Sequence, residues 1–202
     1  ANSALPGLDN INDCYGIMPI ELSGAERKLE QVHAAFVTDK YTTEGLTFDL
    51  QLSATKEDTP CLVDWGDGSF EEATLGVEPV TLRHNFVDAK VDRQHTDQIQ
   101  SANLDLMRLP NTCVLIKFAP TTTPCPVKRL ILDNNRVSEL DLSAFEQCEE
   151  ISANGCYMSQ IKLPQSKLLK KLSLRSGTIT EINLSPYTAL EELMLAFNKL
   201  SS

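Results

Sequence analysis

The chain has little of what most catalytic and metal sites are built from. Only three histidines, His33, His84 and His95, are scattered through its 202 residues, and none of the six cysteines belongs to a Cys-x-x-Cys pair. This scarcity argues against a zinc site, a histidine-rich metal site and a cysteine–histidine nucleophilic pair. The sequence therefore predicts no catalytic residue and no cofactor, and its one metal candidate is a calcium site.

Long apolar runs and basic residues are also scarce. No stretch of about 18 apolar residues occurs, so we expect no membrane-spanning helix. The 18 Lys and Arg residues are outnumbered by 28 Asp and Glu residues, and the formal net charge of −10 would repel the phosphates of nucleic acids. From Val127 onward nine basic residues balance nine acidic ones, so the acidic excess lies within residues 1–126. This asymmetry predicts a boundary near Pro124-Cys125-Pro126.

The cysteines and the first residues bear on the cellular compartment. Cys113 and Cys125 would form a disulfide if they flanked a hairpin, and the alternative is that the cysteines are buried free thiols. No signal peptide is visible, and the opening Ala-Asn-Ser-Ala-Leu-Pro-Gly fits the start of a processed secreted protein. We therefore expect a secreted or cell-surface protein.

The last third of the chain repeats with a period of 21 residues. Apolar residues recur in six columns without an insertion, through three full units and one partial unit. The columns are Val127, Cys148, Leu169, Leu190; Leu130, Ile151, Leu172, Leu193; Leu132, Ala153, Leu174, Leu195; Val137, Met158, Ile179, Leu200; Leu140, Ile161, Ile182; and Leu142, Leu163, Leu184. Each Leu-x-Leu segment predicts a short strand, and one coil cannot bury its apolar face alone, so the pattern predicts a stacked solenoid.

This pattern resembles the leucine-rich repeat family, whose units run Leu-x-x-Leu-x-Leu-x-x-Asn/Cys-x-Leu. Asn135, Cys156 and Asn198 match the Asn/Cys position, where a side chain can support the bend by bonding to backbone, and Gly177 does not. The second half of each unit, as in residues 139–143, is similar to short repeats in surface proteins of Gram-negative anaerobes. The resemblance covers residues 127–202, implies a bacterial surface protein and allows two short strands per coil.

The middle of the chain predicts β-strands. Residues 46–54 alternate apolar and polar side chains, and further strands are expected at residues 61–65, 69–75, 80–86 and 113–118. The segment Val63-Asp-Trp-Gly-Asp-Gly-Ser69, followed by His84-Asn-Phe86, resembles the PKD-like β-sandwich family over roughly residues 38–90. That family's closing strand is absent from residues 89–98, which are polar, so we place it within residues 102–109.

Three parts follow from these patterns. Residues 1–37 form an N-terminal segment, in which the capping box Ser23-Gly-Ala-Glu26 and the spacing of Leu29, Val32, His33 and Phe36 predict an amphipathic helix. Residues 38–126 form a PKD-like β-sandwich with a connecting strand region, and residues 127–202 form the leucine-rich solenoid. The predicted fold is mainly β, with His33 as a packing or rim residue in preference to a ligand.

The loop around the single tryptophan carries two acids, Asp64 and Asp67. Gly66 and Gly68 favour a hairpin turn with positive φ, in which both carboxylates accept hydrogen bonds from backbone amides. The alternatives are a calcium ion held by Asp64, Asp67 and carbonyl oxygens, and a carboxylate-dependent hydrolase. No histidine, lysine or nucleophile is placed beside the acids by sequence spacing, so the turn role is preferred.

The predicted function is non-enzymatic binding or adhesion through the outer face of the solenoid's first-strand sheet. A protein partner is favoured over a glycan, because the face shows no aromatic stripe for stacking on sugar rings. The alternative is a structural spacer that displays a further C-terminal part. The candidate partner-binding residues are Arg129, Ile131, Asp133, Glu150, Ser152, Asn154, Lys171, Ser173, Arg175, Glu192 and Met194.

Overall fold

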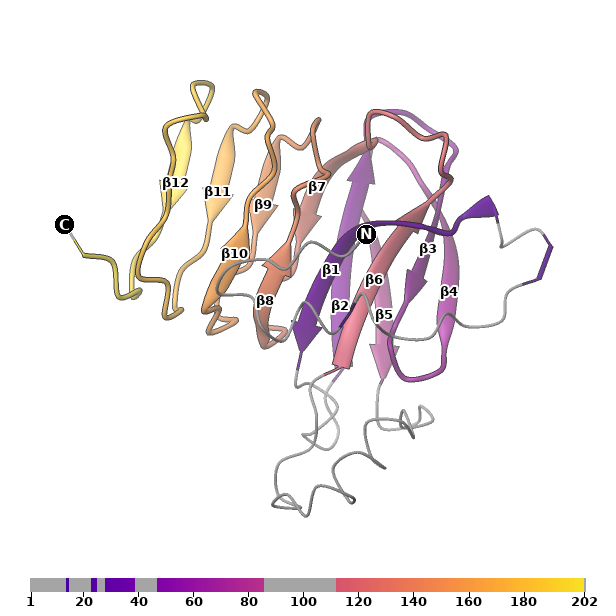
Figure 1. Cartoon of the computed structure of the whole chain (residues 1–202), viewed down its shortest axis with the longest axis horizontal. Coiled ribbons are helices and arrows are strands. Elements are labelled where there is room, and N and C mark those ends of the chain that lie inside the picture. Colours follow the sequence, from indigo (N-terminus) through magenta and orange to yellow (C-terminus); the bar gives the residue numbers. More distant parts are fainter. Residues whose placement is uncertain (1–13, 15–22, 25–27, 39–46, 86–111, 202) are drawn as a thin grey trace, which may run out of the picture.

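The computed structural model describes residues 14, 23–24, 28–38, 47–85 and 112–201, and these form a mainly β fold, as the sequence predicts (Figure 1). Within these residues every regular element is a strand. The strands are β1 (Gln31–Thr38), β2 (Thr47–Ala54), β3 (Thr59–Asp64), β4 (Phe70–Leu75), β5 (Val80–Asn85), β6 (Thr112–Phe118), β7 (Val127–Ile131), β8 (Val137–Asp141), β9 (Glu150–Ser152), β10 (Gln160–Lys162), β11 (Lys171–Ser173) and β12 (Glu192–Met194).

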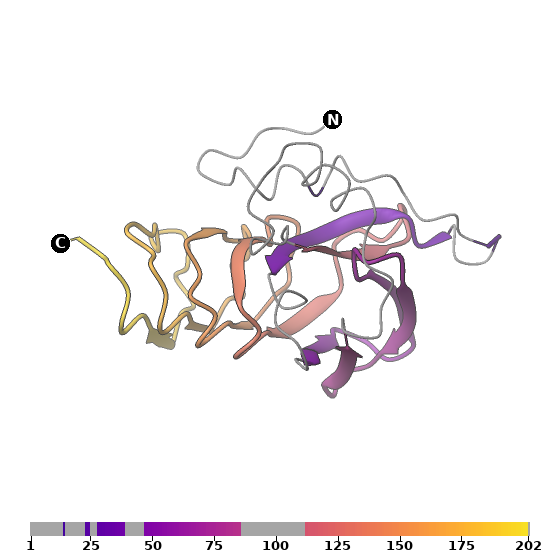
Figure 2. The same cartoon turned by 90° about the horizontal axis from the view of Figure 1, so that it is seen from below.

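The strands form two six-stranded sheets. One has the order β10-β8-β1-β6-β3-β4 and the other the order β12-β11-β9-β7-β2-β5. Pairing is antiparallel among β1 to β6 and parallel from coil to coil, and β1–β8 and β2–β7 are the antiparallel junctions. Viewed along the strands, the two sheets enclose a core and the coils follow one another towards the C-terminal end (Figure 2). Both sheets therefore run without a break from the sandwich into the solenoid.

The solenoid repeats at the period that the sequence predicts. Leu130 lies opposite Ile151, Ile151 opposite Leu172, and Leu172 opposite Leu193, each pair being 21 residues apart. On the other side of the coils β8 and β10 pair with the same offset. The first two coils thus carry two strands each, and the next two carry one each, so the chain ends in a β-solenoid of about three turns.

One hydrophobic core extends through both parts. Phe36, Phe48 and Trp65 of the sandwich belong to the same buried cluster as Leu130 and Ile151 of the solenoid. The ring of Phe48 lies 5.6 Å from that of Phe36 and 5.9 Å from that of Trp65. Because the cluster is continuous, the inner face of the first coil is buried against sandwich residues.

Residues in the Asn/Cys column tie each bend to backbone, as the sequence predicts. The Asn135 amide donates to the carbonyls of Leu132 at 3.0 Å and Asp49 at 2.6 Å and accepts from Asp49 N–H at 3.1 Å. The Cys156 thiol lies 3.2 Å from Leu132 O, and Asn198 donates to Leu174 O at 2.6 Å. Each bend is therefore bonded to the element before it.

Gly177 breaks this column because its position has no room for a side chain. A Cβ built on Gly177 would lie 2.6 Å from Asn198 Oδ1 and 2.7 Å from Met158 O. Asn198 Oδ1 also accepts a hydrogen bond from Ile179 N at 3.2 Å. The side chain of Asn198 from the following coil thus supports the bend that Gly177 cannot support itself.

The predicted N-terminal helix is wrong for the residues that the structure describes. Residues 31–38 form β1, which pairs with β6 on one side and β8 on the other. Residues 25 and 26 of the proposed capping box lie outside the described residues. Phe36 enters the main core, whereas Ala35 and Val37 enter a second cluster on the opposite face. A strand buried on both faces carries apolar side chains on both, so it lacks the apolar–polar alternation by which a strand is recognised. In such an apolar segment some residues also lie at helical spacing, and this suggested a helix.

Of the two alternatives left open for the cysteines, the disulfide between Cys113 and Cys125 is wrong. Cys113 is bonded to Cys14, with a Cα–Cα distance of 5.2 Å, and Cys125 is a buried free thiol. Cys113 belongs to the second cluster and Cys125 to the main core, on opposite faces of the sheet, so these two cysteines cannot meet. The free-thiol alternative holds for Cys61, Cys125, Cys148 and Cys156, all of them buried.

The expected strands of the sandwich are confirmed as β2 to β6, with shifts of one or two residues at their ends. The closing strand expected at residues 102–109 lies outside the described residues, as do Leu46 and Phe86. No helix in the described part of the chain has the length and apolar character needed to cross a membrane.

The first prediction concerns Gly177. We expect Gly177→Ala to lower the free energy of unfolding in urea by about 1–3 kcal/mol, because the added methyl group must displace Met158 O or Asn198. Gly24→Ala is the matched control, since a Cβ at Gly24 meets nothing within 4 Å. Equal stability of the two variants would contradict the close packing at Gly177.

The second prediction concerns the buried thiols. Desolvation raises the pKa of Cys61, Cys125 and Cys148 from 9.0 to about 12. The unfolded chain therefore releases these protons above about pH 9, whereas the folded chain keeps them until about pH 12. We expect stability to be unaffected by these thiols below pH 9 and to fall above it, on the order of 1 kcal/mol per pH unit for each thiol.

Urea unfolding curves between pH 7 and the alkaline range measure this slope. Ellman's reagent at pH 8 should detect no thiol in the folded protein and four after denaturation without reductant, because Cys14 and Cys113 are paired. Rapid labelling of the folded protein, or a stability that is flat through pH 10, would show that the thiols are accessible.

Candidate functional site

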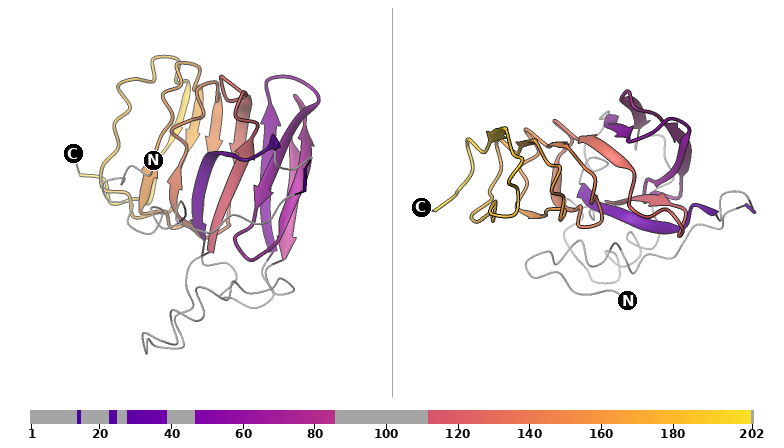
Figure 3. Two further views of the ribbon diagram at one scale, coloured as in Figure 1. Left: turned by 45° about the vertical axis from the view of Figure 1, so that its right-hand side comes forward. Right: turned by 90° about the horizontal axis from the view of Figure 1, so that it is seen from above.

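The outer face of the sheet formed by β7, β9, β11 and β12 carries the candidate partner-binding residues, on coils stacked to one side of the sandwich (Figure 3). Its first column alternates in charge along the stack. Arg129 lies opposite Glu150, with 3.4 Å between Nε and Oε2, and Lys171 lies opposite Glu192, with 3.9 Å between Nζ and Oε1. The structure thus brings these four residues together in ion pairs across adjacent coils.

A second column of the face bonds the coils together. Asp133 Oδ1 accepts hydrogen bonds from Ser152 Oγ at 2.7 Å and Asn154 N at 2.8 Å. One coil further on, Asn154 Oδ1 accepts from Ser173 Oγ at 2.7 Å and Arg175 N at 3.0 Å. The sequence analysis did not predict this ladder, although acid or amide oxygens at 21-residue spacing are a signal that could have revealed it. The ladder fixes the relative position of three coils.

The exposed part of this surface lies in its later coils. Among the described residues the exposed large apolar side chains all belong to the solenoid, namely Tyr157, Leu168, Leu193, Met194, Phe197 and Leu200. Met194 and Arg175 are both on the candidate face, and both are exposed. Ile131 is half-buried on the first strand. The accessible candidates are therefore concentrated in the third and fourth coils.

Two exposed aromatic residues were missed by sequence reasoning. Tyr157 is 69% exposed and Phe197 is 80% exposed, both on the turns that follow the first strands. Phe197 shares positive φ with Asn134, Gly155 and Ser176, which precede it at 21-residue intervals. A bulky residue is uncommon in this backbone region. The repeat alignment could have found this column, because Asn and Gly occupy its first two positions.

The tryptophan loop is a turn, and the predicted role of its acids is confirmed. Asp64 Oδ1 accepts from Gly66 N and Asp67 Oδ1 accepts from Ser69 N, each at 3.0 Å. Gly66 and Gly68 have φ values of 78° and 91°, as the hairpin turn requires. The turn joins β3 to β4 at the edge of its sheet.

Tertiary packing adds two partners that sequence spacing did not reveal. His84 Nε2, from β5 in the opposite sheet, lies 2.6 Å from Asp67 Oδ2, and the His84 ring stacks on Trp65 with centroids 4.7 Å apart. Lys117 Nζ, from β6, lies 3.6 Å from Asp64 Oδ2. These side chains are nearly buried, so the turn is bonded to both sheets.

The Ser69, His84 and Asp67 side chains meet without the geometry of a catalytic triad. Ser69 Oγ lies 3.5 Å from His84 Nε2, the same nitrogen that contacts Asp67, and Ser69 Oγ donates to Asp67 Oδ1 at 2.5 Å. In a triad the acid and the nucleophile contact different nitrogens of the histidine, which lets the ring pass a proton between them. This cluster holds the turn in place.

A calcium ion at this turn would have to compete with the groups that already contact the two acids. Both carboxylate oxygens of Asp64 and of Asp67 contact N–H, O–H or ammonium groups. Within the described ranges no group of three or more His, Cys, Asp or Glu side chains could hold a metal ion. Burial raises the pKa of Asp64, and the Gly66 N–H and the Lys117 ammonium act in the opposite direction.

Comparison with known proteins identifies no family: no protein-family model, curated protein or solved structure matches this chain.

The third prediction tests the tie between the turn and β5. We expect His84→Phe, which keeps a flat ring against Trp65, to lower the free energy of unfolding by about 1–3 kcal/mol, because Asp67 loses a buried donor. The control is Arg83→Gln, which breaks the neighbouring ion pair of Arg83 with Asp49, where Arg83 is largely exposed. This control should unfold like the original protein. A His84→Phe variant as stable as Arg83→Gln would show that the Asp67 contact is dispensable.

Proposed function

We propose that this protein is a non-enzymatic binding protein of the cell surface or extracellular space, and that the outer face of its solenoid sheet recognises a partner protein. The observation that carries the proposal is the ladder of hydrogen bonds and ion pairs between adjacent coils. It holds side chains at fixed positions before a partner arrives, which lowers the entropy lost on binding.

The accessible residues on and beside this face favour a protein as the partner. Binding energy in protein interfaces is concentrated in aromatic residues and arginine. Arg175 and Met194 are exposed on the face, and Tyr157 and Phe197 are exposed on the adjoining turns. Glycan binding through the same face has less support, because no aromatic residue lies among its three outer columns.

Three further observations support the remaining parts of the proposal. The disulfide Cys14–Cys113 fits an oxidising compartment. The resemblance of the two halves to PKD-like and leucine-rich repeat sequences fits a bacterial surface protein. The Ser69–His84–Asp67 cluster lacks the arrangement for nucleophilic catalysis, which favours binding over hydrolysis.

A structural spacer is the alternative function. The two sheets continue from the sandwich into the coils, so the molecule would hold whatever is attached to its two ends at a fixed relative position. The two functions differ in one measurable respect. A binding face has an affinity for a partner that depends on its own side chains, and a spacer has none.

The fourth prediction is a binding measurement on the whole chain. We expect a hit when the purified chain is screened by surface plasmon resonance against extracellular matrix proteins and surface polysaccharides. Lys171→Glu with Arg175→Glu should weaken the hit by about tenfold or more, since both reversals change the charge of exposed side chains on the face and Lys171 loses its pairing with Glu192. Lys162→Glu, on β10 of the other sheet, is the control.

The outcomes separate the two functions. A protein hit that is sensitive to the double reversal and insensitive to Lys162→Glu supports the solenoid face. A polysaccharide hit with the same pattern would keep the face and change the partner class. No hit at tens of micromolar, or equal weakening by the control, would favour the spacer.

A further inference from the structure

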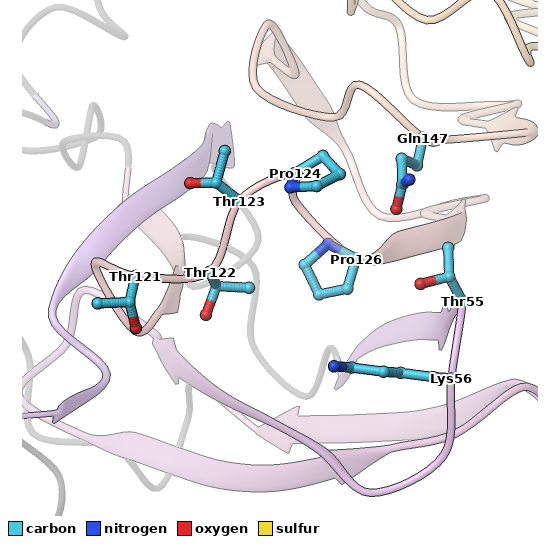
Figure 4. Close-up of a pocket in the computed structure, with 8 residues that line it drawn as sticks. All are labelled: Thr55, Lys56, Thr121, Thr122, Thr123, Pro124, Pro126 and Gln147. Carbon is cyan, nitrogen blue, oxygen red and sulfur yellow. The ribbon is translucent and has the colours of Figure 1, made fainter.

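A cavity of about 330 Å³ lies where three connections of the fold meet (Figure 4). The segment that follows β2 contributes Thr55 and Lys56, the β6–β7 connection contributes residues 121–124 and 126, and the β8–β9 connection contributes Gln147. The cavity shares no residue with the solenoid face, although Pro126 lies three residues before Arg129 and Gln147 three residues before Glu150. Its volume is at the small end of the range for ligand sites, which suits a molecule of one ring.

The walls of this cavity are held by backbone hydrogen bonds. Thr55 N donates to Pro126 O at 2.8 Å and joins two of the three connections directly. Thr122 N donates to Ala119 O at 2.9 Å, and the Thr59 hydroxyl donates to Lys56 O at 2.9 Å. The cavity therefore exists before a ligand binds.

The polar side chains of the lining are available to a ligand. No hydrogen bond within the described part of the chain engages the hydroxyls of Thr55 and residues 121–123 or the amide of Gln147. The lining thus offers four hydroxyls and one amide that can donate and accept, on residues that are exposed or half-buried. Figure 4 shows Pro124 and Pro126 between the threonine segment and Gln147, with the Thr123 hydroxyl turned away from Gln147.

The charge of the lining has one sign. Lys56 supplies its only charged group, and its ammonium is directed towards the threonine segment in Figure 4. Among residues with described positions Lys56 has no ion-pair partner, and none of the lining residues is acidic. In a chain with a net charge of −10, an unpaired ammonium beside unpaired hydroxyls selects for a ligand with one negative charge.

We propose that this cavity binds a sugar acid, a single hydroxylated ring that carries one carboxylate. The carboxylate would pair with Lys56, the ring hydroxyls would bond to the threonine hydroxyls and Gln147, and the apolar face of the ring would pack on the two prolines. Nucleotides fit poorly, because the lining has one cation and no aromatic ring for a base. An apolar ligand would leave the lining hydroxyls without partners.

The test uses the whole chain and two-dimensional NMR titration with sodium glucuronate and galacturonate. Glucose tests the need for the carboxylate, and acetate tests the need for the hydroxylated ring. We expect dissociation constants in the millimolar range for the sugar acids, as befits about a dozen heavy atoms, and about tenfold weaker binding of glucose and acetate. Shifts should be confined to amides near Lys56 and residues 121–123.

Two variants locate the interaction without threatening the fold. Lys56→Gln keeps the length of an exposed side chain and should weaken sugar-acid binding about tenfold, whereas Lys162→Gln on β10 should not. Thr122→Val keeps the shape of the residue and removes one hydroxyl, so it should weaken glucuronate more than acetate.

Equal affinity for acetate and glucuronate would overturn the proposal in favour of simple anion binding. No shift at tens of millimolar sugar acid, or full binding by Lys56→Gln, would overturn it outright. Neither result bears on the solenoid face, because the two sites share no residue.

Discussion

The pairing of β2 with β7 is the interaction on which the rest of the structure depends. Gln51 to Ala54 of the sandwich pair with the first strand of the solenoid, and the Asn135 amide closes the junction by bonding to both backbone groups of Asp49. A parallel coil cannot bury its inner face without a neighbour. The sandwich supplies that neighbour, and every later coil is positioned by the one before it.

Several buried polar side chains among the described residues hold parts of the fold together. The acids of the tryptophan turn bond to amides, to His84 and to Lys117, and thereby connect the two sheets of the sandwich. Asp133 and Asn154 perform the same task between coils. A buried carboxylate or amide is costly without partners, so these networks also explain why the sites most suggestive of chemistry are saturated with donors. The binding that we propose is therefore placed on exposed residues of the later coils and at the cavity beside Lys56.

The position of the candidate face could be predicted from the sequence, but the bonds between its side chains could not. The sequence placed eleven residues on one sheet face because strands alternate their side chains, and the register of β7, β9, β11 and β12 confirms the alignment. It did not reveal which of those side chains bond to a neighbouring coil, because that depends on distances between residues 21 positions apart. It also missed His84 beside Asp67, since β3 and β5 belong to different sheets.

The sequence by itself determined the period, the number of coils and the turn around Trp65, because each rests on spacing within a few dozen residues. Only the tertiary structure decided that residues 31–38 are a strand and that Cys113 bonds to Cys14. Both depend on β1 and β6 lying side by side in the middle of a sheet with apolar clusters on both faces. Burial on two faces removes the alternation that marks a strand, and a pairing across 99 residues leaves no trace in local spacing.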